Sequence, residues 1–316
     1  MHVYDFVSKS ITEAQVENIV TKAGYNAKDY TYSPRVDHDG CVAQGNTVMS
    51  LTSLRNAAKD LKLKVEIVSA IGSEGGSASL SSAAFATPYT VNISMSPDTV
   101  QSLLASNYYL YGFKAVQATQ GGGAPLVWFQ SQTFSTSTVV DWEEQYQAYT
   151  SNSQIITNGQ IFASNSVDID LGQILMAGPG GVGPVVNGGP SLAISIQNTT
   201  SGPFTCGISQ MQNGSSTPLC AFPLFGNNLD VIAPIEKVLL LFSTIPVNTG
   251  TVIMQAYGPS ILIDLTSDNT RSVDYDINAG WSWGGFNWAQ QIAPNSQLVP
   301  LLIEPASSTS KIRMVA

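Results

Sequence analysis

The chain has 316 residues, a net charge of −9 and a sequence pI of about 4.5. An acidic chain lacks the basic patches that bind nucleic acid, so the composition argues against a nucleic-acid partner. The longest unbroken apolar run covers residues 238–242, far short of the ~18 residues that span a bilayer, so we expect no transmembrane segment.

Charge is distributed unevenly along the chain. Residues 1–75 carry 8 Lys or Arg and 9 Asp or Glu, whereas residues 76–316 carry 5 and 13. The larger part is instead rich in Ser, Thr, Asn, Gln and Gly, as are many extracellular sandwiches, coat proteins and self-associating proteins. The first ten residues lack the charged and apolar regions of a signal peptide, and the localisation stays open.

Residues 1–71 predict a small α+β module. A helix is expected at 12–23, because Thr12 and Gln15 have the spacing of a capping box and Gly24 can end the helix. The alternation in LKVEIVSA predicts a strand. The expected element order is βαβαβ, over residues 2–7, 12–23, 41–49, 52–61 and 62–70.

Residues 72–87 predict a flexible linker, because their Gly, Ser and Ala content cannot bury enough apolar surface to order the segment. The only histidines, His2 and His38, precede this linker. A Ser-His-Asp or Cys-His site in the rest of the chain would therefore need the N-terminal module to dock there. His38 and Cys41 resemble half a zinc site, but no second pair completes it, and a polar turn is the simpler explanation.

From residue 88 onward, evenly spaced short strand candidates with Gly and Asn between them predict a mainly β region, with a short helix or turn at 98–105. Two stretches, 111–171 and 206–265, share an ordered series of matches at offsets of 91 to 95 positions. We therefore expect an internal duplication, as two tandem antiparallel β-sandwich domains, 88–190 and 191–316, packed about a pseudo-two-fold axis. The matches are Gly112 with Gly207, Pro125 with Pro218, Glu144 with Glu236, Gly159 with Gly250, and Asp170-Leu171 with Asp264-Leu265.

The two copies differ at one strand. QYQAY at 145–149 alternates polar and apolar residues, whereas KVLLLF at 237–242 is apolar on both faces. A strand of the second kind is covered on both sides, either by the first copy or by another chain. Packing within one chain is the simpler explanation. If another chain covers the strand instead, the strand that mediates assembly consists of Val238, Leu239, Leu240 and Leu241.

Three cysteines leave at least one unpaired thiol in a monomer. Cys206 and Cys220 flank Asn213-Gly214, a strong hairpin signal, so they would lie nearly opposite each other on two strands. That placement allows a disulfide, although buried cysteines often serve simply as small apolar residues. Cys41 lies in the N-terminal module and is expected to be free.

Carboxylates supply a candidate metal site. Asp274, Asp276 and Asn278 alternate in SVDYDIN, which places them on one face of a strand. Oxygen ligands on one face could hold calcium. The spacing departs from a calcium loop, however, and a solvated strand face is the simpler explanation.

Aromatic residues concentrate in GWSWGGFNW at 280–288, which contains Trp281, Trp283, Phe286 and Trp288. If exposed, these rings could stack on sugars or lie at a membrane interface, because an indole combines an apolar body with one polar N–H group. If buried, they would plug the end of the second sandwich. No basic stripe accompanies them, so attraction to anionic lipid is not expected.

Three classes of function remain. The first, which the composition favours, is a non-enzymatic, self-associating structural or coat-like protein with a separate N-terminal module. The second is a secreted binding protein, lectin-like or pore-forming, that uses residues 281–288 on a glycan or lipid surface. The third is an enzyme, but no catalytic set is recognisable. No cofactor is expected, because GPGGVG at 178–183 contains a proline, is followed by another and opens no helix.

Overall fold

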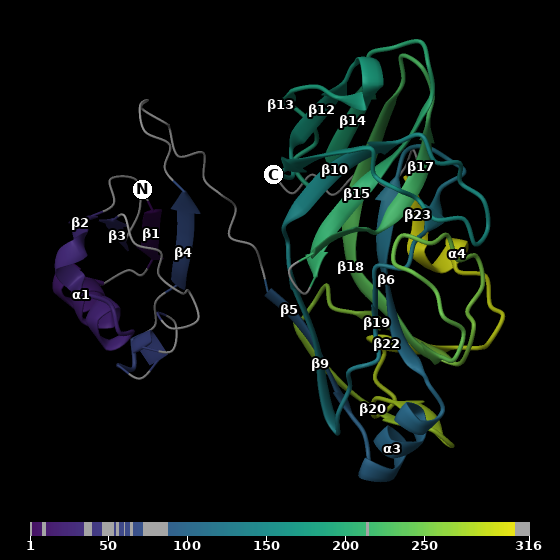
Figure 1. The fold of residues 1–316 in the computed structure, drawn as a ribbon, viewed down its shortest axis with the longest axis horizontal. Helices are drawn as coiled ribbons and strands as arrows, with labels where there is room; N and C mark the ends of the chain where they lie inside the picture. Colours follow the sequence, from purple (N-terminus) through teal and green to yellow (C-terminus); the bar gives the residue numbers. More distant parts are fainter. Residues whose placement is uncertain are drawn as a thin grey trace. The chain divides into compact units, whose positions relative to one another are not determined.

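The computed structural model describes residues 2–7, 11–34, 40–45, 54, 57–59, 61–63, 66–71, 88–212 and 215–306. The chain divides into two compact units, Met1–Phe85 (unit 1) and Ala86–Ala316 (unit 2) (Figure 1). It is mainly β, as predicted, with 48% strand and 13% helix. The expected linker at 72–87 and His38 of the expected half zinc site lie outside the described residues.

Unit 1 contains a four-stranded antiparallel sheet with the order β2-β3-β1-β4. The predicted capping box is present, because Thr12 and Gln15 bond reciprocally at the start of α1. The sequence did not reveal the second strand, which follows a single 3-10 turn. The elements are β1 (His2–Val7), α1 (Glu13–Lys22), η1 (Ala27–Asp29), β2 (Tyr30–Pro34), β3 (Gly40–Gly45) and β4 (Glu66–Ile71).

Unit 2 is built almost entirely from short strands. Its first part contains β5 (Pro88–Ser94), α3 (Pro97–Ala105), β6 (Tyr109–Ala118), β7 (Ala124–Pro125), β8 (Phe129–Ser131), β9 (Ser137–Glu143), β10 (Tyr146–Ser151), β11 (Asn165–Ile169), β12 (Gln173–Ala177), η2 (Pro179–Gly181) and β13 (Val185–Asn187). It continues with β14 (Ile194–Asn198), β15 (Phe204–Gln212), β16 (Ser215–Pro218), β17 (Cys220–Leu224), β18 (Leu229–Ser243), β19 (Ser260–Asp264), β20 (Thr270–Asp276), β21 (Gly280–Ser282), β22 (Ala289–Ile292), α4 (Val299–Leu302) and β23 (Ile303–Pro305).

These strands form three sheets, and each contains strands from both sides of residue 190. The first has the order β11-β10-β15-β17-β7, with β16 beside β15. The second runs β13-β12-β14-β18-β19-β22, with β6 paired to β18 and β8 and β23 paired to β6. The third has the order β21-β20-β5-β9. The expected boundary between residues 190 and 191 therefore separates no compact units, because strands from either side complete one another's sheets.

The first two sheets contain corresponding strand orders. β11-β10-β15-β17 takes its first two strands from the first expected copy, and β19-β18-β6-β8 takes its first two from the second. Gly207 lies opposite Tyr149 in the first series, and Gly112 lies opposite Leu240 in the second.

The expected assembly strand lies inside unit 2. β18 pairs with β6 on one edge and with β19 on the other. Alternate side chains of β18 belong to two separate apolar clusters, one containing Trp128 and the other Tyr111. The chain itself therefore covers both faces, and the proposal of an open assembly strand is corrected for its four residues, which are at most 1% exposed: Val238, Leu239, Leu240 and Leu241.

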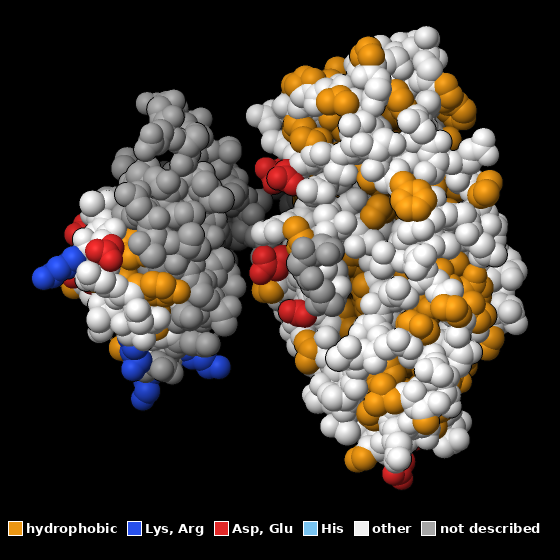
Figure 2. Space-filling view, viewed as in Figure 1, with side chains coloured by type: hydrophobic (Ala, Val, Ile, Leu, Met, Phe, Trp, Pro, Cys, Tyr) orange, Lys and Arg blue, Asp and Glu red, His pale blue; other side chains and the backbone are white. Residues whose placement is uncertain are grey.

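The surface of unit 2 reflects the low content of charged residues in its sequence. On the face shown in Figure 2 it is mostly uncharged, with scattered apolar side chains and few carboxylates. None of the described helices is long and apolar enough to cross a bilayer.

Candidate functional site

The aromatic residues at 281–288 divide into a buried part and a surface part. Trp281 is only 4% exposed, and its indole N–H donates to the Pro259 carbonyl at 3.1 Å. Its ring stacks on Phe242 with 5.6 Å between centroids and also contacts Tyr275. Trp281 is thus part of the core, as the burial alternative predicts, and is not a ligand-binding residue.

Trp283 fixes the loop that follows. Its indole N–H donates to the Phe286 carbonyl oxygen at 2.7 Å. Gly284 and Gly285 between them adopt φ values of +74° and +73°, a region that side chains with a Cβ rarely enter. The loop therefore has a defined turn geometry that orients the next aromatic side chain.

Phe286 and Arg271 both contact the ring of Trp288. The Phe286 ring lies nearly parallel to that of Trp288, at 16° and 6.2 Å between centroids, and the Arg271 guanidinium carbon lies 5.0 Å from the Trp288 ring. Arg271 is held by the Asp264 carbonyl, the Ser267 hydroxyl and the Asp268 carboxylate, the last at 3.0 Å. Phe286 remains 60% exposed. We call Arg271, Trp283, Phe286 and Trp288 the aromatic platform.

The platform has two acidic neighbours, Asp268 and Asp264, the second of which bonds through its backbone to Trp288 and Arg271. The charge of Arg271 is paired with Asp268. The side chains of Asn287, in the same loop, and of Gln290 and Gln291, in β22 after it, are exposed and uncharged. A rigid apolar ring flanked by uncharged hydrogen-bonding groups suits a ligand that is itself part apolar and part hydroxylated.

The candidate calcium ligands serve a turn instead. One Asp276 oxygen accepts from the backbone N–H groups of Asn278 and Ala279, both at 2.9 Å, and the other accepts from the Thr99 hydroxyl at 3.0 Å. These bonds hold the pKa of Asp276 below its usual range. Asp274 lies in the strand ladder opposite Ser282. The described part of the chain contains no cluster of three or more His, Cys, Asp or Glu suited to a metal, so the turn explains the pattern.

The expected disulfide is not formed. Cys206 lies opposite Phe222 in the β15–β17 pair, whereas Cys220 lies opposite Pro125 of β7, and both are free and buried. In the β15–β17 register the residue opposite Cys206 lies two positions beyond Cys220, so the two cysteines do not face each other. The Asn213-Gly214 turn lies outside the described residues, between paired strands.

A second site, which was not predicted from the sequence, surrounds a buried lysine. Lys114 of β6 is 0% exposed, and its ammonium lies 2.7 Å from a Glu236 carboxylate oxygen. The ammonium also lies 4.4 Å from the ring centroid of Trp142, with Trp128 and Tyr89 at 5.8 Å. Burial lowers the pKa of Lys114, and the nearby carboxylates oppose that shift.

Two tyrosines connect this lysine site to the matched glutamates. Tyr146 donates to Glu236 at 3.4 Å, and Tyr89 donates to Glu144 at 3.3 Å. A register shift between Ile235 and Val238 interrupts the β6–β18 ladder at Glu236; such bulges redirect side chains. The match of Glu144 with Glu236 and a lysine within apolar YGFKAV were the available signals. With Lys114 fully enclosed, we assign this cluster to holding β6 against β18.

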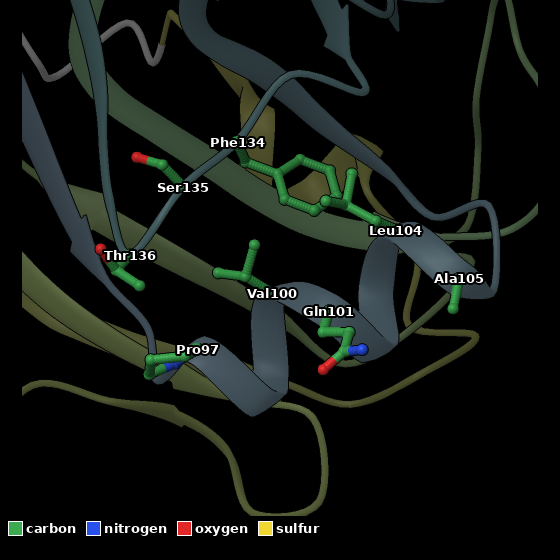
Figure 3. Close-up of a pocket in the computed structure, with 8 residues that line it drawn as sticks. All are labelled: Pro97, Val100, Gln101, Leu104, Ala105, Phe134, Ser135 and Thr136. Carbon is green, nitrogen blue, oxygen red and sulfur yellow. The ribbon is translucent and has the colours of Figure 1, made fainter.

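Two of the cavities in the described part of unit 2 bear on function. One, of about 600 Å³, lies between α3 and the segment 134–136, and its lining is largely apolar (Figure 3). Leu104 and Val100 of α3 line it together with Phe134, which packs edge-on against Phe242. The other, of about 350 Å³, lies between the segments 158–160 and 245–251.

Comparison of the chain with protein-family models, curated proteins and solved structures finds no match. The functional argument therefore rests on the site geometry.

Proposed function

We propose that unit 2 is a non-catalytic binding module that recognises a neutral glycan through the aromatic platform, with Phe286 as its anchor. The observation that carries the proposal is the exposed Phe286 ring, which lies against Trp288 in a loop that the Trp283 indole bonds. A preordered ring loses little conformational entropy when a ligand binds, so the contact contributes more of its energy to affinity. Sugar rings present apolar C–H faces that pack on such rings, while their hydroxyls bond to amides.

A lipid surface is the alternative ligand, and charge argues against it. Anchoring to anionic lipid uses several Lys or Arg side chains, each contributing about 1 kcal/mol near the surface. The platform contains one cation, Arg271, and Asp268 neutralises it. Asp264, whose backbone bonds to Arg271 and Trp288, adds a further carboxylate rather than a cation at this surface.

Self-assembly loses its main support in this structure. That interpretation rested on the uncharged composition and on a strand open to a second chain, and the strand in question, β18, is covered by β6 and β19 of the same unit. A glycan-binding function needs no such strand. It also agrees with the sequence-based alternative of a secreted binding protein. The binding residues proposed here are those of the aromatic platform, without the buried Trp281.

A glycan array probed with the full chain tests the proposal. We expect binding to neutral glycans that Phe286→Ala reduces at least about tenfold, the effect of losing roughly 1.4 kcal/mol. Phe162→Ala and Phe225→Ala are matched controls, because these rings are 64% and 54% exposed elsewhere on the unit. Both controls should bind as the parent does.

A vesicle arm separates the two ligand classes. We expect no sedimentation of the full chain with vesicles of phosphatidylcholine and phosphatidylserine. Sedimentation that Phe286→Ala abolishes would identify a lipid-binding surface and contradict the glycan proposal. Glycan binding that Phe286→Ala leaves intact would contradict the assignment to the platform.

A further inference from the structure

The smaller cavity of unit 2 lies beside the opposite end of β19 from the aromatic platform. Trp288 bonds to the backbone of Asp264 at the end of β19, whereas Tyr257, which lines the cavity, precedes Ser260 at its start. A strand of this length spans about 15 Å. The cavity therefore shares no residue with the platform and can bind independently of it.

Two ordered loops form the walls of this cavity. The Tyr111 hydroxyl donates to the Ile245 carbonyl at 2.7 Å and accepts from the Val247 N–H at 3.0 Å, which fixes the second loop from beneath. On the other side, Asn158 has a φ of +63°, and its N–H donates to the Val252 carbonyl at 2.9 Å. The cavity is thus shaped before any ligand binds.

The cavity lining presents donors and acceptors without charge. The Tyr257 hydroxyl donates to the Asn158 side-chain oxygen at 2.7 Å, which leaves the Asn158 amide N–H groups available. Gln160 donates to the Thr249 carbonyl, which leaves its own amide oxygen as an acceptor. The Asn248 side chain makes no hydrogen bond to any residue that the structure describes. Every lining side chain is uncharged.

We propose that this cavity is a second binding site, which takes one neutral sugar residue. Side-chain amides bond to hydroxyl pairs as donor and acceptor together, and Pro246 and Val247 supply an apolar wall for the C–H face. An ionic ligand would leave its charge unpaired, which is costly in a partly enclosed site. The volume of about 350 Å³ is near the lower end of ligand pockets, which suits a single ring.

Two sites on one rigid unit would act together on a branched or clustered glycan. Binding at one site raises the effective concentration at the other, so the combined affinity can greatly exceed that of either site alone. Single sugars, which reach only one site, should bind weakly, with a Kd of about 1 mM.

Saturation-transfer NMR and calorimetry on the full chain with methyl glycosides test the second site. The probes are neutral hexosides and an N-acetylhexosaminide, with methyl glucuronide and a glucosaminide as charged analogues. We expect one neutral glycoside to bind, Asn248→Ala and Tyr257→Phe to weaken it about fivefold or more, and Phe286→Ala to leave it unchanged. Gln132→Ala, an exposed amide outside both sites, is the matched control.

The results separate this proposal from the proposed function. If no neutral glycoside binds, if charged analogues bind equally well, or if neither cavity variant weakens binding, the second site is overturned. Array binding that depends on Phe286 would stand in each of those cases. Conversely, glycoside binding that depends on Asn248, without any effect of Phe286 on the array, would support the cavity and overturn the platform.

Discussion

The ammonium of Lys114 lies 2.7 Å from the carboxylate of Glu236, and no part of Lys114 reaches solvent. The two residues are 122 positions apart and belong to β6 and β18, the two halves of the longest ladder in unit 2. Removing water from a lysine is costly, and the compensation comes from Glu236 and from the Trp142 ring. The ion pair therefore helps to fix the register in which β6 pairs with β18.

Lys114→Met tests this role. The variant leaves the Glu236 carboxylate without the Lys114 ammonium that neutralises it. We therefore expect the variant to lower the free energy of unfolding by about 3 kcal/mol. Lys114→Met combined with Glu236→Gln removes both charges and should recover most of the loss. Urea denaturation of the parent, the two single variants and the double variant completes the cycle. A double variant as unstable as the sum of the singles would show that the two side chains do not interact.

Asp230 gives a pH dependence of defined sign. The residue is buried, accepts from the Thr119 hydroxyl and the Gln120 N–H, and its pKa is raised by burial. Between the ordinary pKa and the raised one, the folded chain holds a proton that the unfolded chain has lost. The contribution of Asp230 to stability is therefore complete below the ordinary value and is lost as pH rises through the folded value.

Asp230→Asn removes this titration. We expect the variant to gain stability relative to the parent as pH rises from 3 to 7, measured by urea denaturation. Asp276→Asn is the control of opposite sign, because the pKa of Asp276 is lowered by the backbone N–H groups that it accepts. The parent should lose stability relative to that variant as pH falls below the ordinary value. A constant difference across the pH range for Asp230→Asn would contradict the assignment.

The cysteines give a direct chemical test. Burial raises the pKa of Cys206 well above its ordinary value and that of Cys220 to about 12, so neither forms the reactive thiolate at neutral pH. We expect iodoacetamide to label both slowly in the folded chain and rapidly in urea, without prior reduction, as read by peptide mass spectrometry. A peptide pair that is released only after reduction would show the disulfide and contradict the free thiols.

Local features were predictable from the sequence because they depend on near neighbours. The capping box of Thr12 and Gln15 needs only a few adjacent residues and is present, and the short helix or turn expected at 98–105 is the helix α3. Strand character was readable from alternation and turn residues in many places, although β2 was missed. Strand partners were not: β10 pairs with β15 across more than fifty residues, and nothing local in QYQAY selects that partner.

The sequence predicted the segment that contains the candidate site, but not which of its residues form the site. The concentration of aromatics at 281–288 identified the right segment, but not which rings reach the surface. Trp281 is buried because Phe242 and Tyr275 enclose it, and Phe242 arrives from a distant strand. Phe286 is exposed because two consecutive glycines turn the chain outward ahead of it. Both outcomes depend on tertiary packing that the spacing of residues does not encode.

The matched glycines Gly112 and Gly207 provide the last prediction. A Cβ on Gly112 would collide with the ring of Phe129, and a Cβ on Gly207 would collide with the Cys220 carbonyl and the ring of Tyr149. Each glycine thus admits an aromatic side chain from a neighbouring strand. We expect Gly112→Ala and Gly207→Ala each to lower the free energy of unfolding by about 2 kcal/mol, measured by urea denaturation, because buried rings cannot move aside cheaply. Gly121→Ala, where a Cβ meets open space, should change stability little. If both core variants matched Gly121→Ala, the close packing at these two positions would be refuted.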